Sequence, residues 1–198
     1  MILLAKITWK PGTMVYPIPA ALVTCGDCEE NYNIITIAWT GTICTNPAMT
    51  YISIRPERYS YDIINKTKEF VINLTTENLA KATDFCGVKS GRDVNKFKEM
   101  HLTPQKASKV KAPLIKESPV NIECKVEKIV PLGSHHMFMA KVLAVNIDEE
   151  LLDEKNKFHL DKAKPICYCH GDYYGLKKSL GHFGFSVAKK KKKKKRKK

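Results

Sequence analysis

The sequence lacks several features that would assign it quickly to a class. No apolar run approaches the roughly 20 residues that a membrane-spanning helix needs. The motifs GxGxxG and GxxxxGKS/T are also missing, so classical dinucleotide and P-loop phosphate sites are not expected. The N-terminal MILLAKITWKPG has no basic start and no small-residue cleavage site. We therefore predict a first strand there, no membrane insertion and a cytoplasmic protein.

Cysteine is present in an odd number, seven, with no secretion signal, which argues against a disulfide framework. Cys25 and Cys28 form a CxxC, and Cys167 and Cys169 lie two apart. Two separate sets of thiols explain these spacings. The alternatives are a redox dithiol at the CxxC, or a four-thiolate metal site formed by both pairs. The βαβ context of a thioredoxin-like dithiol and a second CxxC are both missing, so we predict no metal site.

Basic charge is concentrated at one end of the sequence. The formal net charge is +14, and the ten basic residues at positions 189–198 account for most of it, leaving +4. We divide the chain into one domain at residues 1–188 and a poly-lysine tail at 189–198 that like-charge repulsion keeps disordered. Such a tail either aids solubility or binds polyanions without sequence preference.

Short apolar runs bounded by Gly, Pro and Asn recur through the domain, and 43% of the residues are apolar, enough for a core. β-branched and aromatic residues predict strands at 21–25, 34–39, 51–55, 70–74, 121–129, 137–145 and 165–168. Helical spacing predicts short helices at 60–68, 76–86 and 93–100, the first with Ser60 as its N-cap. Many strands and few helices favour a mainly β fold, an antiparallel barrel.

The most informative stretch is residues 33–60, NIITIAWTGTICTNPAMTYISIRPERYS. On a strand, Thr36, Ala38 and Thr40 share one face, with the larger Ile35, Ile37 and Trp39 on the other. A face of small residues lets a planar ligand lie against the backbone. An ordinary half-buried strand with threonines explains the same periodicity.

The second half of this stretch adds phosphate chemistry. Ser53 and Arg55 share a strand face, and Arg58 and Ser60 follow at a predicted helix start. Helix N-terminal amides and guanidinium groups together bind phosphate oxygens. Two solvated arginines beside an ordinary cap are the alternative.

Five segments taken in order resemble the flavin reductase-like, flavoredoxin-type proteins over roughly residues 10–187. They are NIITIAWTG, ISIRPERYSYDII, EFVINLTTENLAKATDFCG, SGRDVNKF and the late GxY and LGHFG pattern. The resemblance implies a six-stranded antiparallel split barrel of Greek-key type that forms a homodimer and holds FMN near the subunit interface. It also implies an FMN-binding set: Asn33, Thr36, Ala38, Trp39, Thr40, Ser53, Ile54, Arg55, Arg58, Ser60 and Lys96. Asn95 replaces the family's usual aspartate beside that lysine.

The same resemblance indicates an FMN-dependent oxidoreductase. NADH or NADPH would give hydride to FMN, and electrons would pass to free flavin, ferric iron or a redox partner. The alternative is an FMN-binding electron-transfer protein with no nicotinamide reaction of its own. His135, in GSHHMF, is the candidate catalytic residue, because related reductases carry a Gly-x-His pattern near the flavin.

Overall fold

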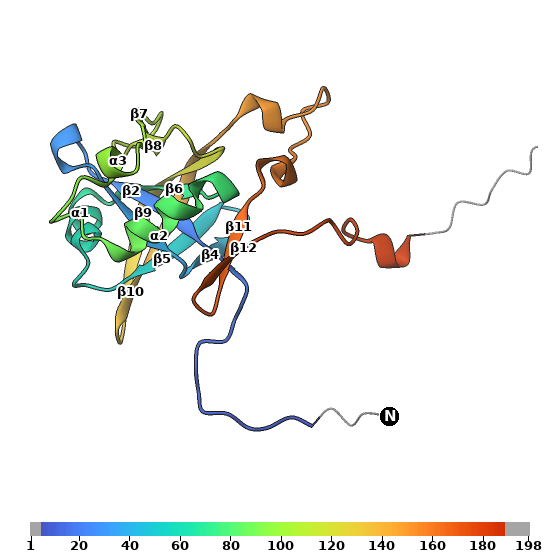
Figure 1. The fold of residues 1–198 in the computed structure, drawn as a ribbon. Helices are drawn as coiled ribbons and strands as arrows, with labels where there is room; N and C mark the ends of the chain where they lie inside the picture. Colours follow the sequence, from blue (N-terminus) through green and yellow to red (C-terminus); the bar gives the residue numbers. More distant parts are fainter. Residues whose placement is uncertain (1–4, 189–198) are drawn as a thin grey trace, which may run out of the picture.

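Seven antiparallel strands form the main sheet of the computed structural model, in the order β3-β2-β6-β9-β10-β5-β4 (Figure 1). Their bounds are β2 Ala21–Cys25, β3 Asn33–Ile37, β4 Thr40–Cys44, β5 Met49–Ile54, β6 Glu69–Leu74, β9 Val120–Leu132 and β10 His135–Ile147. The edge strands β3 and β4 are consecutive in sequence, and only Ala38 and Trp39 separate them. The sheet must therefore curl until its two edges approach each other at these residues.

The expectation of a mainly β, antiparallel, barrel-like fold is confirmed, but the main sheet has seven strands where six were predicted. The strand that the apolar pattern missed is β4, TGTIC, whose Thr and Gly residues carry little strand signal. Two small sheets add β1 Ile18–Pro19, β11 Ile166–Cys169 and β12 Asp172–Gly175, and β7 Pro104–Gln105 with β8 Leu114–Ile115.

Within residues 5–188, three short α-helices pack on the sheet: α1 Tyr59–Thr67, α2 Ala80–Val88 and α3 Lys96–Glu99. Single 3₁₀ turns lie at Glu29–Asn31, Glu77–Leu79, Glu149–Leu151, Leu160–Ala163 and Phe185–Val187. Helix α1 ends where Lys68 takes a left-handed conformation, φ 59°, and its N–H donates to the carbonyl of Ile64 at 2.8 Å. Among residues 5–188, no helix has the length and apolarity to cross a bilayer.

The core follows the predicted period of two. From β2, Ala21, Val23 and Cys25 face the inside of the curled sheet, where Ile64 of α1 and Phe138 of β10 join them. The opposite face of the same strand belongs to a second cluster beneath α2 and α3, with Leu22, Ile34, Leu79, Ala82, Cys86, Phe97, Leu102 and Ile115. Strands β2 and β3 are therefore covered on both faces, which explains why all five residues of β2 are buried.

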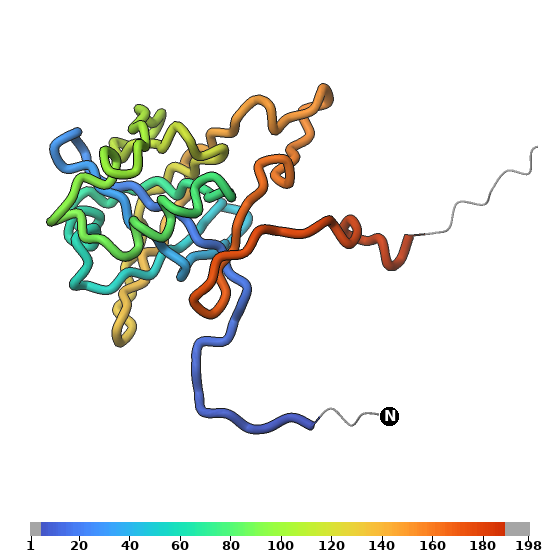
Figure 2. The backbone as a smooth tube through the Cα atoms, viewed as in Figure 1, coloured from blue at the N-terminus to red at the C-terminus, as the bar shows by residue number. Residues whose placement is uncertain are grey.

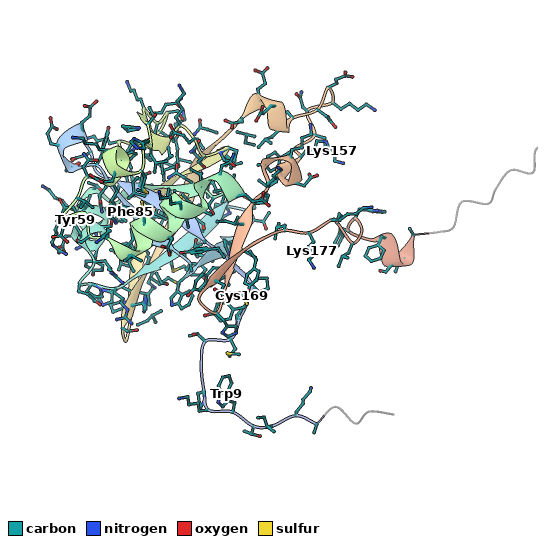
Figure 3. The ribbon with its side chains drawn as sticks, viewed as in Figure 1. Trp9, Tyr59, Phe85, Lys157, Cys169 and Lys177 are labelled. Carbon is teal, nitrogen blue, oxygen red and sulfur yellow. The ribbon has the colours of Figure 1, made fainter. Side chains whose placement is uncertain are left out.

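The structure describes residues 5–188, and the predicted disordered tail at 189–198 lies outside them, as do residues 1–4. The predicted first strand is wrong for residues 5–12, which form no regular structure. Segments at both ends of the described chain run away from the body (Figure 2). Trp9 and Lys177 mark these segments in Figure 3, well apart from Tyr59 and Phe85 in the body.

Candidate functional site

Two adjoining cavities lie where β3 meets α2 and the turn between β5 and α1. The first, of about 380 Å³, contains Tyr168 and Tyr173 in its lining, and we call it the tyrosine cavity. The second, of about 240 Å³, contains Arg58 and Arg92, and we call it the arginine cavity. They share Ile35, Thr36, Arg58 and Gly87, so one elongated molecule can occupy both.

The arginine cavity is built around the first turn of α1. Arg58 is the N-cap of this helix and Tyr59 its first residue, so the positive end of the helix dipole faces the cavity. Four cationic side chains line the cavity: Arg58, Lys89, Arg92 and Lys96. Among the described residues that line it, Glu57 is the one acid. This concentration of positive charge and free helix amides suits a phosphate group.

Ser60 does not act as the predicted N-cap. It lies inside the first turn of α1, is buried, and its Oγ accepts a hydrogen bond from Asn33 Nδ2 at 2.7 Å. The N-cap lies two residues earlier than predicted, at Arg58, because Pro56 and Glu57 form a turn in which the N–H of Arg58 donates to the carbonyl of Arg55 at 3.1 Å. Asn33 and Ser60, far apart in sequence, are thus brought together at this cavity.

Lys96 is buried at the inner end of the arginine cavity. Its Nζ donates to the carbonyls of Ile34 and Cys86 at 2.7 and 2.8 Å. Burial is the largest cause lowering the pKa of Lys96, and the charge of Arg58 acts in the same direction. The ammonium group therefore links β3 to the end of α2 and places positive charge behind the cavity. Asn95 caps α3 by accepting from the N–H of Lys98 at 3.1 Å.

Arg92 is a site residue that sequence reasoning missed. Its Nη1 donates to the carbonyl of Glu57 at 3.2 Å, and its guanidinium lies 5.2 Å from the centre of the Tyr59 ring. Arg92 belongs to the segment SGRDVNKF, in which the resemblance implies a site role for Lys96 alone. The two residues before Arg92, Ser90 and Gly91, also line the cavity.

Eight of the predicted residues line the tyrosine cavity: Thr36, Ala38, Trp39, Ser53, Ile54, Arg55, Arg58 and His135. Asn33, Ser60 and Lys96 line the arginine cavity, together with Thr36 and Arg58. Thr40 lines neither and faces a third cleft, where its Oγ1 donates to the carbonyl of Tyr51 at 2.6 Å. The common face expected for Thr36, Ala38 and Thr40 is wrong, because β3 ends at Ile37 and Thr40 already belongs to β4.

His135 lies at the start of β10 on the wall of the tyrosine cavity. Its ring centre is 6.4 Å from that of Trp39, and Ser134 Oγ lies 2.9 Å from its Nδ1. Burial lowers the pKa of His135, and the nearby charge of Arg55 lowers it further, which favours the neutral imidazole at neutral pH. The adjacent His136 points elsewhere and bonds the hydroxyl of Tyr61 at 2.8 Å.

All seven cysteines are free, and the two of the CxxC differ in environment: Cys25 is buried and Cys28 is exposed. Burial raises the pKa of Cys25 to about 12, so its thiol stays protonated at neutral pH. Among residues 5–188, no group of three or more His, Cys, Asp and Glu side chains is arranged to hold a metal ion.

Comparisons with known proteins agree with the segments read from the sequence. A family model described as the flavin reductase like domain matches residues 13–177. A protein of Pyrococcus abyssi is 34% identical over 140 residues, 71% of this chain and 80% of its own.

Two solved structures extend the likeness to the fold. The flavoredoxin of Desulfovibrio vulgaris (Miyazaki F) superposes with a TM-score of 0.86 at 27% identity, covering 93% of this chain and 100% of its own. An FMN-binding protein from Thermus thermophilus gives a TM-score of 0.74 at 22% identity, covering 92% of this chain and 99% of its own.

Proposed function

Because the chain belongs to the flavin reductase-like, split-barrel family of flavoproteins, we propose that its two cavities hold one FMN. The phosphate lies in the arginine cavity and the ring system in the tyrosine cavity. The observation that carries this proposal is the first turn of α1, surrounded by four cationic side chains, opening directly into a cavity with aromatic walls. The FMN-binding protein from Thermus thermophilus, which has the same fold, supports the choice of flavin.

At the phosphate end, Arg58 and Arg92 pair with the phosphate oxygens while Lys96 adds charge from behind. The Asn33–Ser60 hydrogen bond fixes β3 against α1, so the cavity keeps its shape without the ligand. Arg55 lines the tyrosine cavity, and its Nη1 lies 3.4 Å from the carboxylate of Glu57. That exposed pair is weak, and the guanidinium is available to a phosphorylated ligand.

At the ring end, the backbone at Thr36, Ala38 and Trp39 passes along the cavity, with Ser53 and Ile54 of the neighbouring β5 opposite. Thr36 Oγ1 already donates to the carbonyl of Thr83, which ties β3 to α2. Its methyl and Cβ therefore form a small, apolar surface for a flat ring. Thr40, in the third cleft, contributes by holding β4 to β5 rather than by direct contact.

When bound, FMN would accept hydride from NADH or NADPH and pass electrons to flavin, ferric iron or a redox partner. The chain's own contribution is position and charge. His135 and Arg55 lie in the wall of the tyrosine cavity, where a cationic guanidinium favours negative charge on a bound ring. The neutral imidazole of His135 can donate or accept a proton there.

Absorbance of natively purified protein tests FMN binding directly, followed by titration of FMN monitored by quenching of flavin fluorescence. We expect a flavin spectrum and one FMN per chain. Protein that stays colourless after incubation with FMN would overturn the proposal.

Anaerobic stopped-flow mixing of the loaded protein with NADH and with NADPH separates the two candidate functions. Bleaching of the flavin absorbance at a rate useful for turnover is expected of a reductase. An unchanged spectrum with both nucleotides would leave the alternative, an electron-transfer protein without a nicotinamide reaction.

Two copies of the chain form the proposed functional unit. The support lies in the segments that leave the body (Figure 2). Both carry large apolar side chains that are mostly exposed: Ile7, Trp9 and Val15 at one end, Leu180, Phe183 and Val187 at the other. The third cleft is lined by residues 12–16 and by Ala38 and Trp39 of the tyrosine cavity, so a second copy near the N-terminal segment would border the site.

A further inference from the structure

The β11–β12 hairpin gives the tyrosine cavity an aromatic wall that the FMN-binding set does not use. Tyr168 and Tyr173 stand directly opposite each other in the antiparallel pair, with ring centres 5.7 Å apart and planes at 59°. Tyr16 packs behind Tyr168 at 6.2 Å and beside His170 at 4.4 Å. The wall is thus held from outside the cavity while the two tyrosines line it.

Asp84 faces this wall from α2. Among the residues that the structure describes, it is the one acidic side chain in the lining of the tyrosine cavity. Asp84 and Tyr173 line the same cavity. Burial raises the pKa of Tyr173, and the charge of the Asp84 carboxylate raises it further. The cationic groups of the lining, Arg55 and Arg58, come instead from the turn between β5 and α1.

The part of the tyrosine cavity lined by Asp84, Tyr168 and Tyr173 carries a negative charge. It therefore does not favour a phosphate group or the anionic form of a flavin. A carboxylate beside two aromatic faces attracts a flat ring that carries positive charge, through ion pairing and cation–π contact. The nicotinamide ring of a pyridine nucleotide is such a ring, since it is neutral when reduced and a cationic pyridinium when oxidised. Its carboxamide also supplies N–H donors for the Asp84 carboxylate.

We propose that Asp84, Tyr168 and Tyr173 form the subsite for the nicotinamide ring of the electron donor, and that Asp84 makes the subsite prefer the positively charged ring. The proposal rests on the proposed function, because it requires FMN in the remainder of the two cavities. It assigns a specificity-determining role to a residue outside the FMN-binding set.

The test uses 1-methylnicotinamide, a small cationic pyridinium, and nicotinamide, its neutral counterpart. FMN affinity is measured first, by flavin fluorescence, for the wild type, Asp84→Asn and the control Asp62→Asn. The control removes one carboxylate from an exposed position on α1 outside both cavities. Binding of the two probes to each FMN-loaded protein is then measured by saturation-transfer NMR titration.

We expect all three proteins to bind FMN equally. Asp84→Asn should bind 1-methylnicotinamide about five-fold more weakly, the effect of one surface charge pair, with little change for nicotinamide. Asp62→Asn should match the wild type. Equal affinity of Asp84→Asn and the wild type for 1-methylnicotinamide would overturn the proposed subsite. Loss of FMN affinity in Asp84→Asn would also overturn it, because Asp84 would then contact FMN itself. Failure of the wild type to bind FMN would instead overturn the proposed function.

Discussion

Gly91 is a residue at which one added carbon atom would change the arginine cavity. A Cβ built there meets Asn33 Oδ1 and comes within 2.8 Å of Tyr59 Cδ1. Either Asn33 must give up its bond to Ser60 or the first turn of α1 must move. Overpacking of this kind costs about 1–3 kcal/mol.

We predict that Gly91→Ala lowers FMN affinity about tenfold or more while the protein stays folded. Fluorescence titration of FMN measures the affinity, and circular dichroism checks the fold. Gly12→Ala is the matched control, because a Cβ at Gly12 has no neighbour within 4 Å. Unchanged FMN affinity in Gly91→Ala would mean that the phosphate does not lie in the arginine cavity.

Asp153 offers a second test at the residue scale, far from the site. His159 Nε2 lies 2.9 Å from its Oδ2, and the N–H groups of Lys155 and Lys157 donate to its Oδ1. The hydrogen bond from His159 is the largest cause lowering the pKa of Asp153 from 3.8 to about 2. Because the folded pKa is lowered, the stability that this carboxylate contributes is present above pH 3.8 and is lost as the pH falls through about 2.

The substitution His159→Phe should raise the pKa of Asp153 toward 3.8, though not fully, because the two backbone donors remain. Carbon-detected NMR titration of the carboxyl group measures it. His182→Phe, an exposed histidine elsewhere in the chain, should leave the titration unchanged. An Asp153 midpoint near 3.8 in the wild type would contradict the hydrogen-bonded arrangement.

At the scale of elements, Glu123 of β9 holds a long surface connection to the sheet. The side chain is fully buried, and its carboxylate accepts from the N–H groups of Ser108, Lys109 and Val110 and from Asn146 Nδ2 at 2.8 Å. Burial works to raise the pKa of Glu123, but these hydrogen bonds outweigh it, so the net shift is downward. The carboxylate form is the one that the connection requires.

Glu123→Gln replaces an acceptor oxygen with an NH₂ group that faces backbone donors. We expect a loss of about 2–3 kcal/mol in the free energy of unfolding and faster amide hydrogen exchange at residues 106–112. Urea denaturation and exchange mass spectrometry measure these. Glu127→Gln, exposed on the same strand, should change neither. Equal stability of the two variants would show that the connection is held by apolar contacts, such as those of Val110 and Ala112, instead.

The elements that could be predicted from the sequence are those whose own residues carry a strand signal. Strand β2 was predicted with its observed bounds, because a short apolar run suits a strand that is covered on both faces. Strand β10 was predicted over residues 137–145, where more and less buried residues alternate along the strand. Strand β4 could not be predicted, since its identity comes from pairing with β5, through Thr42 opposite Thr50, and not from its side chains.

The site shows the same division between local and non-local information. Arg58 and Arg55 were predictable because a strand, a proline and a helix start follow each other directly in the chain. Asp84, Arg92 and Tyr173 were not, because they reach the cavities only when α2, the segment before α3 and the β11–β12 hairpin pack around β3. Which distant segments meet at a site depends on tertiary packing, and a short sequence motif does not indicate it.

At the scale of the whole molecule, the cavities lie where the curled sheet brings its own edges together. Ala38 and Trp39 connect the two edge strands, and both line the tyrosine cavity. A backbone hydrogen bond from the N–H of Ser53 to the carbonyl of Trp39, 2.8 Å long, extends the β4–β5 pairing to this connection. The site is thus formed by the closure of the fold, and a change that opens the sheet at this point should weaken ligand binding and stability together.

At the same scale, the exposed terminal segments bear on whether two copies of the chain associate. Leu180 is 96% exposed, Phe183 is at least as exposed as in an extended peptide, and Val187 is 83% exposed, whereas Lys177 and Lys178 on the same segment have the exposure that charged residues normally have. Burying one large apolar side chain contributes about 1.5–3 kcal/mol. A second copy of the chain that covers these side chains would gain enough to hold a dimer at micromolar concentration.

We predict that the double substitution Leu180→Ser and Phe183→Ser raises the dissociation constant of the dimer roughly a hundredfold, since it removes about 3 kcal/mol or more of apolar burial. Size-exclusion chromatography with light scattering over a range of concentrations measures the mass. Lys177→Ser with Lys178→Ser is the matched control and should remain dimeric, because it removes charge but no apolar surface. A wild type that is monomeric at every concentration would refute the dimer. A double variant as dimeric as the wild type would show that the interface lies on the body of the domain and that the segment remains in solvent.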